Sequence, residues 1–164
     1  MNNLILDYME QTAARLPEKT AFADEQTSVA FAALVCRAKK VASALIPLVP
    51  PRSVVGFYMD KGVETVVGFM GAVYAGCAYS QLNLRHPAPR VCAMLETLDT
   101  PIVVTDKAHL TQLEDIDPPA RILLLEELEE TPLDEAALSA VRAQMIDADP
   151  LYVNFTSGST GTPK

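Results

Sequence analysis

Short apolar runs of strand length alternate with segments of helical periodicity along most of this chain. Residues 53–59 form a nearly unbroken apolar run, SVVGFYM, and comparable runs occur at residues 102–105 and 121–125. Runs of this kind are typical of strands that are buried on both faces of a parallel sheet. Because helical segments separate them, the alternation predicts an α/β fold with a mostly parallel sheet flanked by helices.

The segment 31–45 has the clearest helical periodicity, with its apolar side chains on one stripe and Arg37, Lys39 and Lys40 facing away. By weaker patterns of the same kind we expect further helices over residues 3–16, 63–74, 90–98, 108–113 and 135–145. Short extended pieces are expected at residues 20–23 and 28–31 and near 76–79, with a final strand at 151–155.

The segment 63–74 is apolar almost all round and has a face of small residues at spacings of three and four. Such a face lets another backbone approach closely, either in the core of a protein or between helices in a membrane. The stretch is too short to span a bilayer and has Lys61 and Glu64 at its start, so we expect it to pack in the core against a sheet.

The overall composition excludes several classes of function. The net charge of -8 argues against a general nucleic-acid surface, and no apolar stretch is long enough for a membrane helix. An odd count of 3 cysteines without a C-x-x-C pair and an N-terminus without a basic leader favour a reducing, cytoplasmic location. With 2 histidines and no paired cysteines, no metal-site spacing is present.

The tail TSGSTGTPK, residues 156–164, combines the features of a polyphosphate-binding loop. Gly158 and Gly161 permit backbone angles that turn amide N–H groups inward to bind an anion. The surrounding hydroxyl side chains add donors, and Lys164 adds positive charge. The glycine spacing is not that of a Walker loop. Composition alone also permits a flexible surface turn or a linker.

The longer string YVNFTSGSTGTPK resembles the phosphate-binding signature of the adenylate-forming (AMP-binding) superfamily, whose pattern is roughly Y-T-S-G-S-T-G-x-P-K-G. This superfamily comprises acyl- and aryl-CoA synthetases, the adenylation domains of nonribosomal peptide synthetases, and luciferases. Residues 54–87 are similar to an upstream family motif, in register at Gly76, Ala78, Tyr79 and Pro87. Residues 29–34 resemble an early T-Y-x-E-L element less closely.

Two positions depart from the upstream family motif. Gln81 stands where the family usually has proline, and Asn83 stands where it usually has aspartate. From these replacements we expect a turn geometry that differs from the family's. The element Gly-x-Ala-Tyr at residues 76–79 and the start at Met1 favour a free-standing amino-acid-activating ligase or the first module of a peptide synthetase, with the adenylation domains of peptide synthetases as the most similar group.

The resemblance implies an ATP-dependent ligase that converts a carboxylate, here an amino acid, into an acyl-adenylate with release of pyrophosphate. A thiol, on carrier-protein phosphopantetheine or on CoA, then accepts the acyl group. The resemblance assigns the binding of ATP phosphates, with Mg²⁺ as the accompanying ion, to Thr156, Ser157, Gly158, Ser159, Thr160, Gly161, Thr162 and Lys164.

Family enzymes are several times longer than this chain, so residues 1–164 are expected to form the N-terminal portion of an adenylation domain that ends at the phosphate-binding loop. The family's adenine site, substrate pocket and catalytic lysine have no counterpart here. We therefore assign no catalytic residue and expect the piece alone to be inactive. The alternatives are an acyl-CoA synthetase of the same superfamily and a noncatalytic module that binds a nucleotide or pairs with another polypeptide.

Three other side chains invite a functional interpretation. Lys61 and His86 lie in predicted loops, where a solvated or surface role is more common than ligand binding. Cys77 lies in the small-residue stretch without an accompanying histidine pattern, so we expect a buried apolar residue and no nucleophile.

Overall fold

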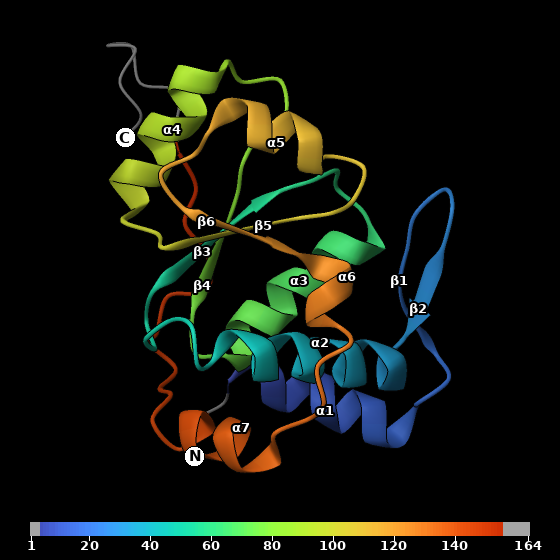
Figure 1. Ribbon diagram of the computed structural model, residues 1–164. Helices are drawn as coiled ribbons and strands as arrows, with labels where there is room; N and C mark the ends of the chain where they lie inside the picture. The colour runs from blue at the N-terminus through green and yellow to red at the C-terminus, as the bar shows by residue number, and fades with distance from the viewer. Residues whose placement is uncertain (1–3, 156–164) are drawn as a thin grey trace.

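The computed structural model describes residues 4–155, over which strands and helices alternate as the sequence predicts (Figure 1). The strands are β1 (Thr20–Ala23), β2 (Ser28–Ala30), β3 (Val54–Tyr58), β4 (Ala78–Gln81), β5 (Ile102–Thr105) and β6 (Arg121–Leu124). The helices are α1 (Ile5–Arg15), α2 (Phe31–Leu45), α3 (Val63–Tyr74), α4 (Ala88–Leu98), α5 (Leu110–Ile116), α6 (Leu125–Leu128) and α7 (Glu135–Arg142).

The main sheet has four parallel strands in the order β4-β3-β5-β6. In the centre of the sheet, Gly56 of β3 is level with Ser80 of β4 on one side and with Val103 of β5 on the other. Strands β1 and β2 form a separate antiparallel hairpin. The parallel sheet with connecting helices confirms the predicted α/β class.

Helices cover both faces of the main sheet (Figure 1). On one face, Val55 and Phe57 of β3 join a core cluster with α2 and α3, and α1 packs against the outside of α2. On the other face, Tyr58 and Val103 join a second cluster with α4 and α5. The residues of β3 therefore alternate between two apolar layers, which explains why its sequence is apolar without breaks.

Helices α2 and α3 approach each other closely at Gly71. A Cβ atom at this position would lie 2.4 Å from Cγ1 of the buried Val41 and 3.3 Å from the carbonyl oxygen of Ala38. The small-residue face of α3 therefore packs inside the protein, as predicted from the sequence. Within residues 4–155, no helix is long and apolar enough to cross a membrane.

Most predicted elements are present with ends shifted by up to three residues, and two differ in type from the structure. The expected strand at residues 151–155 is reduced to a single parallel bridge between Tyr152 and Tyr79, so this segment only begins to extend the sheet beyond β4. The apolar run at residues 121–125 does not remain extended to its end, because β6 stops at Leu124 and Leu125 begins the short helix α6. Both Leu125 and Leu128 of that helix enter the core.

Candidate functional site

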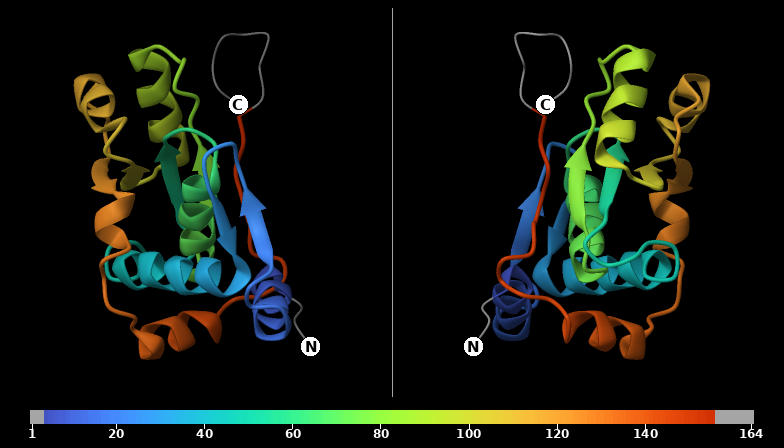
Figure 2. Two further views of the ribbon diagram at one scale, coloured as in Figure 1. Left: turned by 90° about the vertical axis from the view of Figure 1, so that its right-hand side faces the viewer. Right: turned by 90° about the vertical axis from the view of Figure 1, so that its left-hand side faces the viewer.

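An open groove of about 1310 Å³ lies at the carboxyl ends of β3, β4 and β5. Its walls come from the β1–β2 turn, from residues that follow these three strands, and from Tyr152 and Asn154. The hairpin turn reaches the same end of the molecule as the tips of the strands (Figure 2). In open parallel sheets this edge is where ligands bind.

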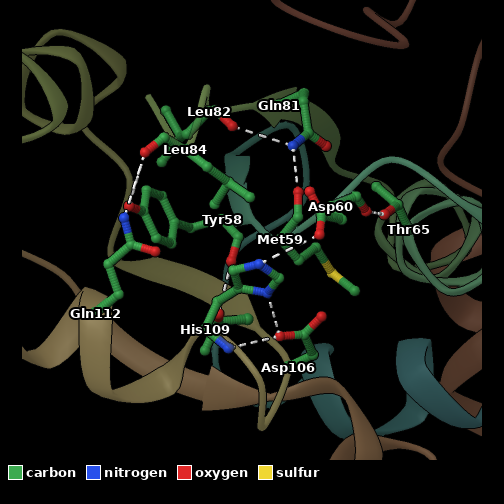
Figure 3. Close-up of polar contacts among 11 residues, drawn as sticks. Tyr58, Met59, Asp60, Thr65, Gln81, Leu82, Leu84, Asp106, His109 and Gln112 are labelled. Atoms are coloured by element: carbon green, nitrogen blue, oxygen red, sulfur yellow. Dashed lines mark hydrogen bonds and ion pairs between the residues drawn. The ribbon is translucent and has the colours of Figure 1, made fainter. Parts of the chain in front are cut away.

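A histidine connects the ends of β3 and β5 in this groove (Figure 3). The Nδ1 atom of His109 lies 2.6 Å from Oδ1 of Asp106, and its Nε2 atom lies 3.4 Å from Oδ2 of Asp60. Asp106 also accepts a hydrogen bond from the His109 backbone N–H at 2.9 Å. Because the two carboxylates bind opposite ring nitrogens, they do not converge on a common point. Among residues 4–155, no cluster of three side chains could hold a metal ion.

Gln81 joins the ends of β3 and β4 at the position where the family usually has proline (Figure 3). Its side-chain amide donates to the carbonyl oxygens of Met59, at 2.9 Å, and of Leu82, at 3.1 Å. A proline side chain could form neither bond. Asn83 accepts a hydrogen bond from the backbone N–H of Arg85 at 2.9 Å, which is the turn contact that an aspartate also makes.

Asp24 fixes the hairpin wall of the groove to helix α3. Its Oδ2 accepts from the backbone N–H of Val63 at 2.9 Å, at the N-terminus of α3. Its Oδ1 accepts from the N–H groups of Gln26 and Thr27, each at 2.8 Å. These hydrogen bonds lower the pKa of the Asp24 carboxyl below its usual value, and the bond from Val63 makes the largest contribution to this shift. The carboxylate therefore holds the turn and the helix in a defined relative position.

The segment that leads to the predicted phosphate-binding loop runs along the outer edge of β4. The Tyr79 N–H donates to the Leu151 carbonyl oxygen at 3.2 Å, and the Val153 N–H donates to the Tyr79 carbonyl oxygen at 2.9 Å. After α7 the chain crosses the length of the sheet toward the carboxyl ends of the strands (Figure 2). The predicted loop itself, Thr156, Ser157, Gly158, Ser159, Thr160, Gly161, Thr162 and Lys164, lies outside the described residues.

The three other side chains considered from the sequence differ in their exposure. Lys61 is exposed at the rim of the groove. His86 is half-buried, and burial, followed by the charge of Arg90, lowers its pKa. Cys77 is buried, and burial raises the pKa of its thiol to about 11, so the reactive thiolate is scarce at neutral pH. The prediction that Cys77 is a buried apolar residue is confirmed.

Sequence reasoning missed the contacts among Asp60, Asp106 and His109. The sequence signal that could have found them is their position after two strands: Asp60 follows β3, and Asp106 and His109 follow β5. The fold and the groove together define an α/β domain with an open groove at the carboxyl edge of a parallel sheet, the edge where ligands bind in such folds.

Comparison with known protein families identifies the family within this fold class. The family model for AMP-binding enzymes matches residues 9–164, and the chain therefore belongs to the AMP-binding enzyme family. This confirms the resemblance found in the tail and in the upstream motif.

Similar proteins include nonribosomal peptide synthetases. Tyrocidine synthase 1 of Brevibacillus parabrevis is 29% identical over 156 residues, which cover 94% of this chain and 14% of that protein. Tyrocidine synthase 3 of the same organism is 34% identical over 163 residues, 98% of this chain and 2% of that protein. The crystal structure of the nonribosomal peptide synthetase FmoA3 in its α-methyl-L-serine-AMP-bound form matches with a TM-score of 0.80 and 25% identity, over 100% of this chain and 17% of that chain.

Proposed function

We propose that residues 1–164 are the N-terminal portion of an adenylation domain and provide the phosphate-binding part of an ATP-dependent ligase. The ligase activates a carboxylate, specifically an amino acid, as an acyl-adenylate. One structural observation carries this proposal: the segment entering the predicted loop follows β4 to the carboxyl edge of the sheet, where Tyr152 and Asn154 line the groove. Family membership and similarity to peptide synthetases support it.

In the proposed reaction, a carboxylate oxygen attacks the α-phosphorus of ATP. The new bond joins this oxygen to phosphorus, the bond between the α-phosphorus and the bridging oxygen breaks, and pyrophosphate leaves with the electron pair. Residues 156–164 bind the β- and γ-phosphates, with backbone N–H groups around Gly158 and Gly161 and the ammonium of Lys164 stabilising the charge that develops on the leaving group. The chain's contribution is thus orientation and charge stabilisation.

The described residues do not fit a protein-held Mg²⁺ site. Asp24 is engaged by three backbone N–H groups, and Asp106 contacts both the ring and the backbone N–H of His109. We therefore assign Mg²⁺ to the phosphates of bound ATP.

In the second half-reaction, a thiol sulfur attacks the carbonyl carbon of the acyl-adenylate and AMP leaves. We propose carrier-protein phosphopantetheine as the acceptor, because the tyrocidine synthases are similar over 94% and 98% of this chain. CoA is the acceptor in the competing proposal of an acyl-CoA synthetase. The two proposals differ in the carboxylate activated and in the thiol used.

The test is ATP–pyrophosphate exchange by the product of the complete reading frame that encodes this chain. Individual amino acids, fatty acids and aryl acids are supplied in parallel. We expect exchange with one amino acid, and we expect Lys164→Ala to reduce it by about 100-fold because a charge-stabilising group is lost. Lys19→Ala, an exposed lysine near β1, is the matched control and should retain activity.

Exchange with a fatty or aryl acid alone would replace the amino-acid proposal by the acyl-CoA synthetase. Absence of exchange with every acid, combined with saturable ATP binding by the 164-residue chain in calorimetry, would instead support a noncatalytic nucleotide-binding module. The 164-residue chain assayed by itself is expected to show no exchange.

A further inference from the structure

Four aromatic side chains link the core of the sheet to the segment that enters the predicted loop. The rings of Phe57 and Phe69 meet edge to face, with centroids 5.1 Å apart. Phe69 stacks on Tyr79 with centroids 4.0 Å apart and an angle of 8° between the planes. Tyr79 contacts Tyr152 with centroids 6.0 Å apart. This aromatic cluster thus runs from buried β3 through α3 and β4 to Tyr152.

The backbone contacts between β4 and this segment are few. A single bridge, with two hydrogen bonds to Tyr79, joins residues 151–153 to the sheet. Upstream, Arg52 anchors the segment, because its Nε donates to Oδ1 of Asp149 at 2.8 Å. Downstream, Phe155 packs on the second core cluster. Between these two anchors, Leu151 packs on the first core cluster and the ring of Tyr152 contacts Tyr79 beside the bridge.

Tyr152 is 56% exposed and lines the groove, so its aromatic contact is not explained by burial in the core. Its ring is held against Tyr79, which is itself fixed from behind by Phe69. The predicted phosphate-binding loop begins four residues after Tyr152. Tyr152 therefore lies on the short segment that enters the loop, with Phe155 as a further anchor between them.

We propose that Tyr79 and Tyr152 are positioning residues that hold the entry of the phosphate-binding loop against β4. This inference rests on the proposed function, because it assigns to the tyrosine pair the placement of the ATP-binding loop. Neither side chain needs to touch ATP. Placement matters because a shift of about 1 Å in a group that orients a substrate can reduce the rate about 100-fold.

The experiment compares Tyr152→Ala, Tyr152→Phe and Tyr8→Ala in the product of the complete reading frame. Tyr8 of α1 is the matched control, because its 59% exposure is close to that of Tyr152 but it lies outside the groove. ATP–pyrophosphate exchange gives kcat/KM separately for ATP and for the carboxylate. Hydrogen exchange measured by mass spectrometry reports the protection of the peptide that contains the Val153 amide.

We expect Tyr152→Ala to lower kcat/KM for ATP about tenfold with less than a twofold change in KM for the carboxylate, since it is the phosphate loop that is displaced. Tyr152→Phe keeps the ring and should retain the wild-type kcat/KM for ATP. Tyr8→Ala should leave this value unchanged as well. Protection of the peptide containing Val153 should fall in Tyr152→Ala and persist in Tyr152→Phe.

Two results would overturn the inference separately from the proposed function. An active wild type whose kcat/KM for ATP is unaffected by Tyr152→Ala refutes the positioning role alone. Equal losses in Tyr152→Ala and Tyr8→Ala also refute it, because they indicate a general effect on the fold. A wild type without exchange on any acid refutes the proposed function, and the role of the tyrosine pair in ATP placement with it.

Discussion

Replacement of Gly71 by alanine tests the packing of α2 against α3. The added Cβ would lie 2.4 Å from Cγ1 and 2.6 Å from Cβ of Val41. Favourable carbon–carbon contacts lie at roughly 3.5–4.0 Å, so the two helices must separate by about 1 Å. A rotamer change of Val41 gives no relief, because its Cβ is fixed to the backbone of α2.

Two opposing effects determine how Gly71→Ala changes the free energy of unfolding. Overpacking of a well-packed core costs about 1–3 kcal/mol, and the upper end applies here because the clash reaches a backbone-fixed atom. Alanine favours the helix over glycine by about 1 kcal/mol. The net expectation for Gly71→Ala is a loss of about 2 kcal/mol, which for a chain of this size lowers Tm by about 4–8 °C.

Thermal and urea unfolding followed by circular dichroism measure this loss. Ser139→Ala, at an exposed position of α7, serves as the control, since it also improves helix propensity but adds no side-chain atom. It should leave Tm unchanged or slightly raised. A Gly71→Ala protein that melts at or above the wild-type temperature would refute the reasoning, because the propensity gain would then exceed any packing strain.

Two further predictions concern titratable groups. The Asp24 pKa is lowered in the folded state, so its carboxylate stabilises the fold above the unfolded pKa of about 3.9, and this contribution disappears as the pH falls through the lower folded value. Asp24→Asn should thus lower the urea midpoint at pH 7 but converge with the wild type in strong acid; an equal deficit at both pH values would contradict this assignment. Burial raises the Cys77 pKa to about 11, so iodoacetamide at pH 8 should alkylate exposed Cys36 and spare Cys77 until urea unfolds the chain. Mass spectrometry that finds both modified at equal rates in the folded protein would contradict the burial of Cys77.

The fold class could be predicted because the strongest signals are local. The stripe over residues 31–45 and the apolar segment 63–74 coincide with α2 and α3. The final strand could not be predicted correctly, because its sequence has strand character while its pairing depends on what lies beside β4. Among residues 151–155, only Tyr152 pairs with β4. The sequence pattern indicates that a segment is extended, but neighbouring segments determine whether it forms a full set of strand hydrogen bonds.

The candidate site was predicted less completely than the fold. The tail and Gln81 could be recognised from the family pattern, but the role of the glutamine amide could not, since its acceptor on Met59 lies 22 residues away. The contact of Asp60 with His109 likewise joins residues that are distant in sequence. Only the order of the parallel strands brings them to one edge, and that order is a property of the whole sheet.

The strand order also has a consequence for biosynthesis. Strand β3 ends at residue 58, whereas its neighbour β5 ends at residue 105, a separation of 47 residues. At a synthesis rate of about 5–20 residues per second, β5 is completed roughly 2–9 s after β3. During this interval an apolar strand of the nascent chain has a free edge, because β4 can occupy only the other side. The apolar edge of β3 is therefore open to association with other nascent chains or to chaperone binding until residues 102–105 have been made.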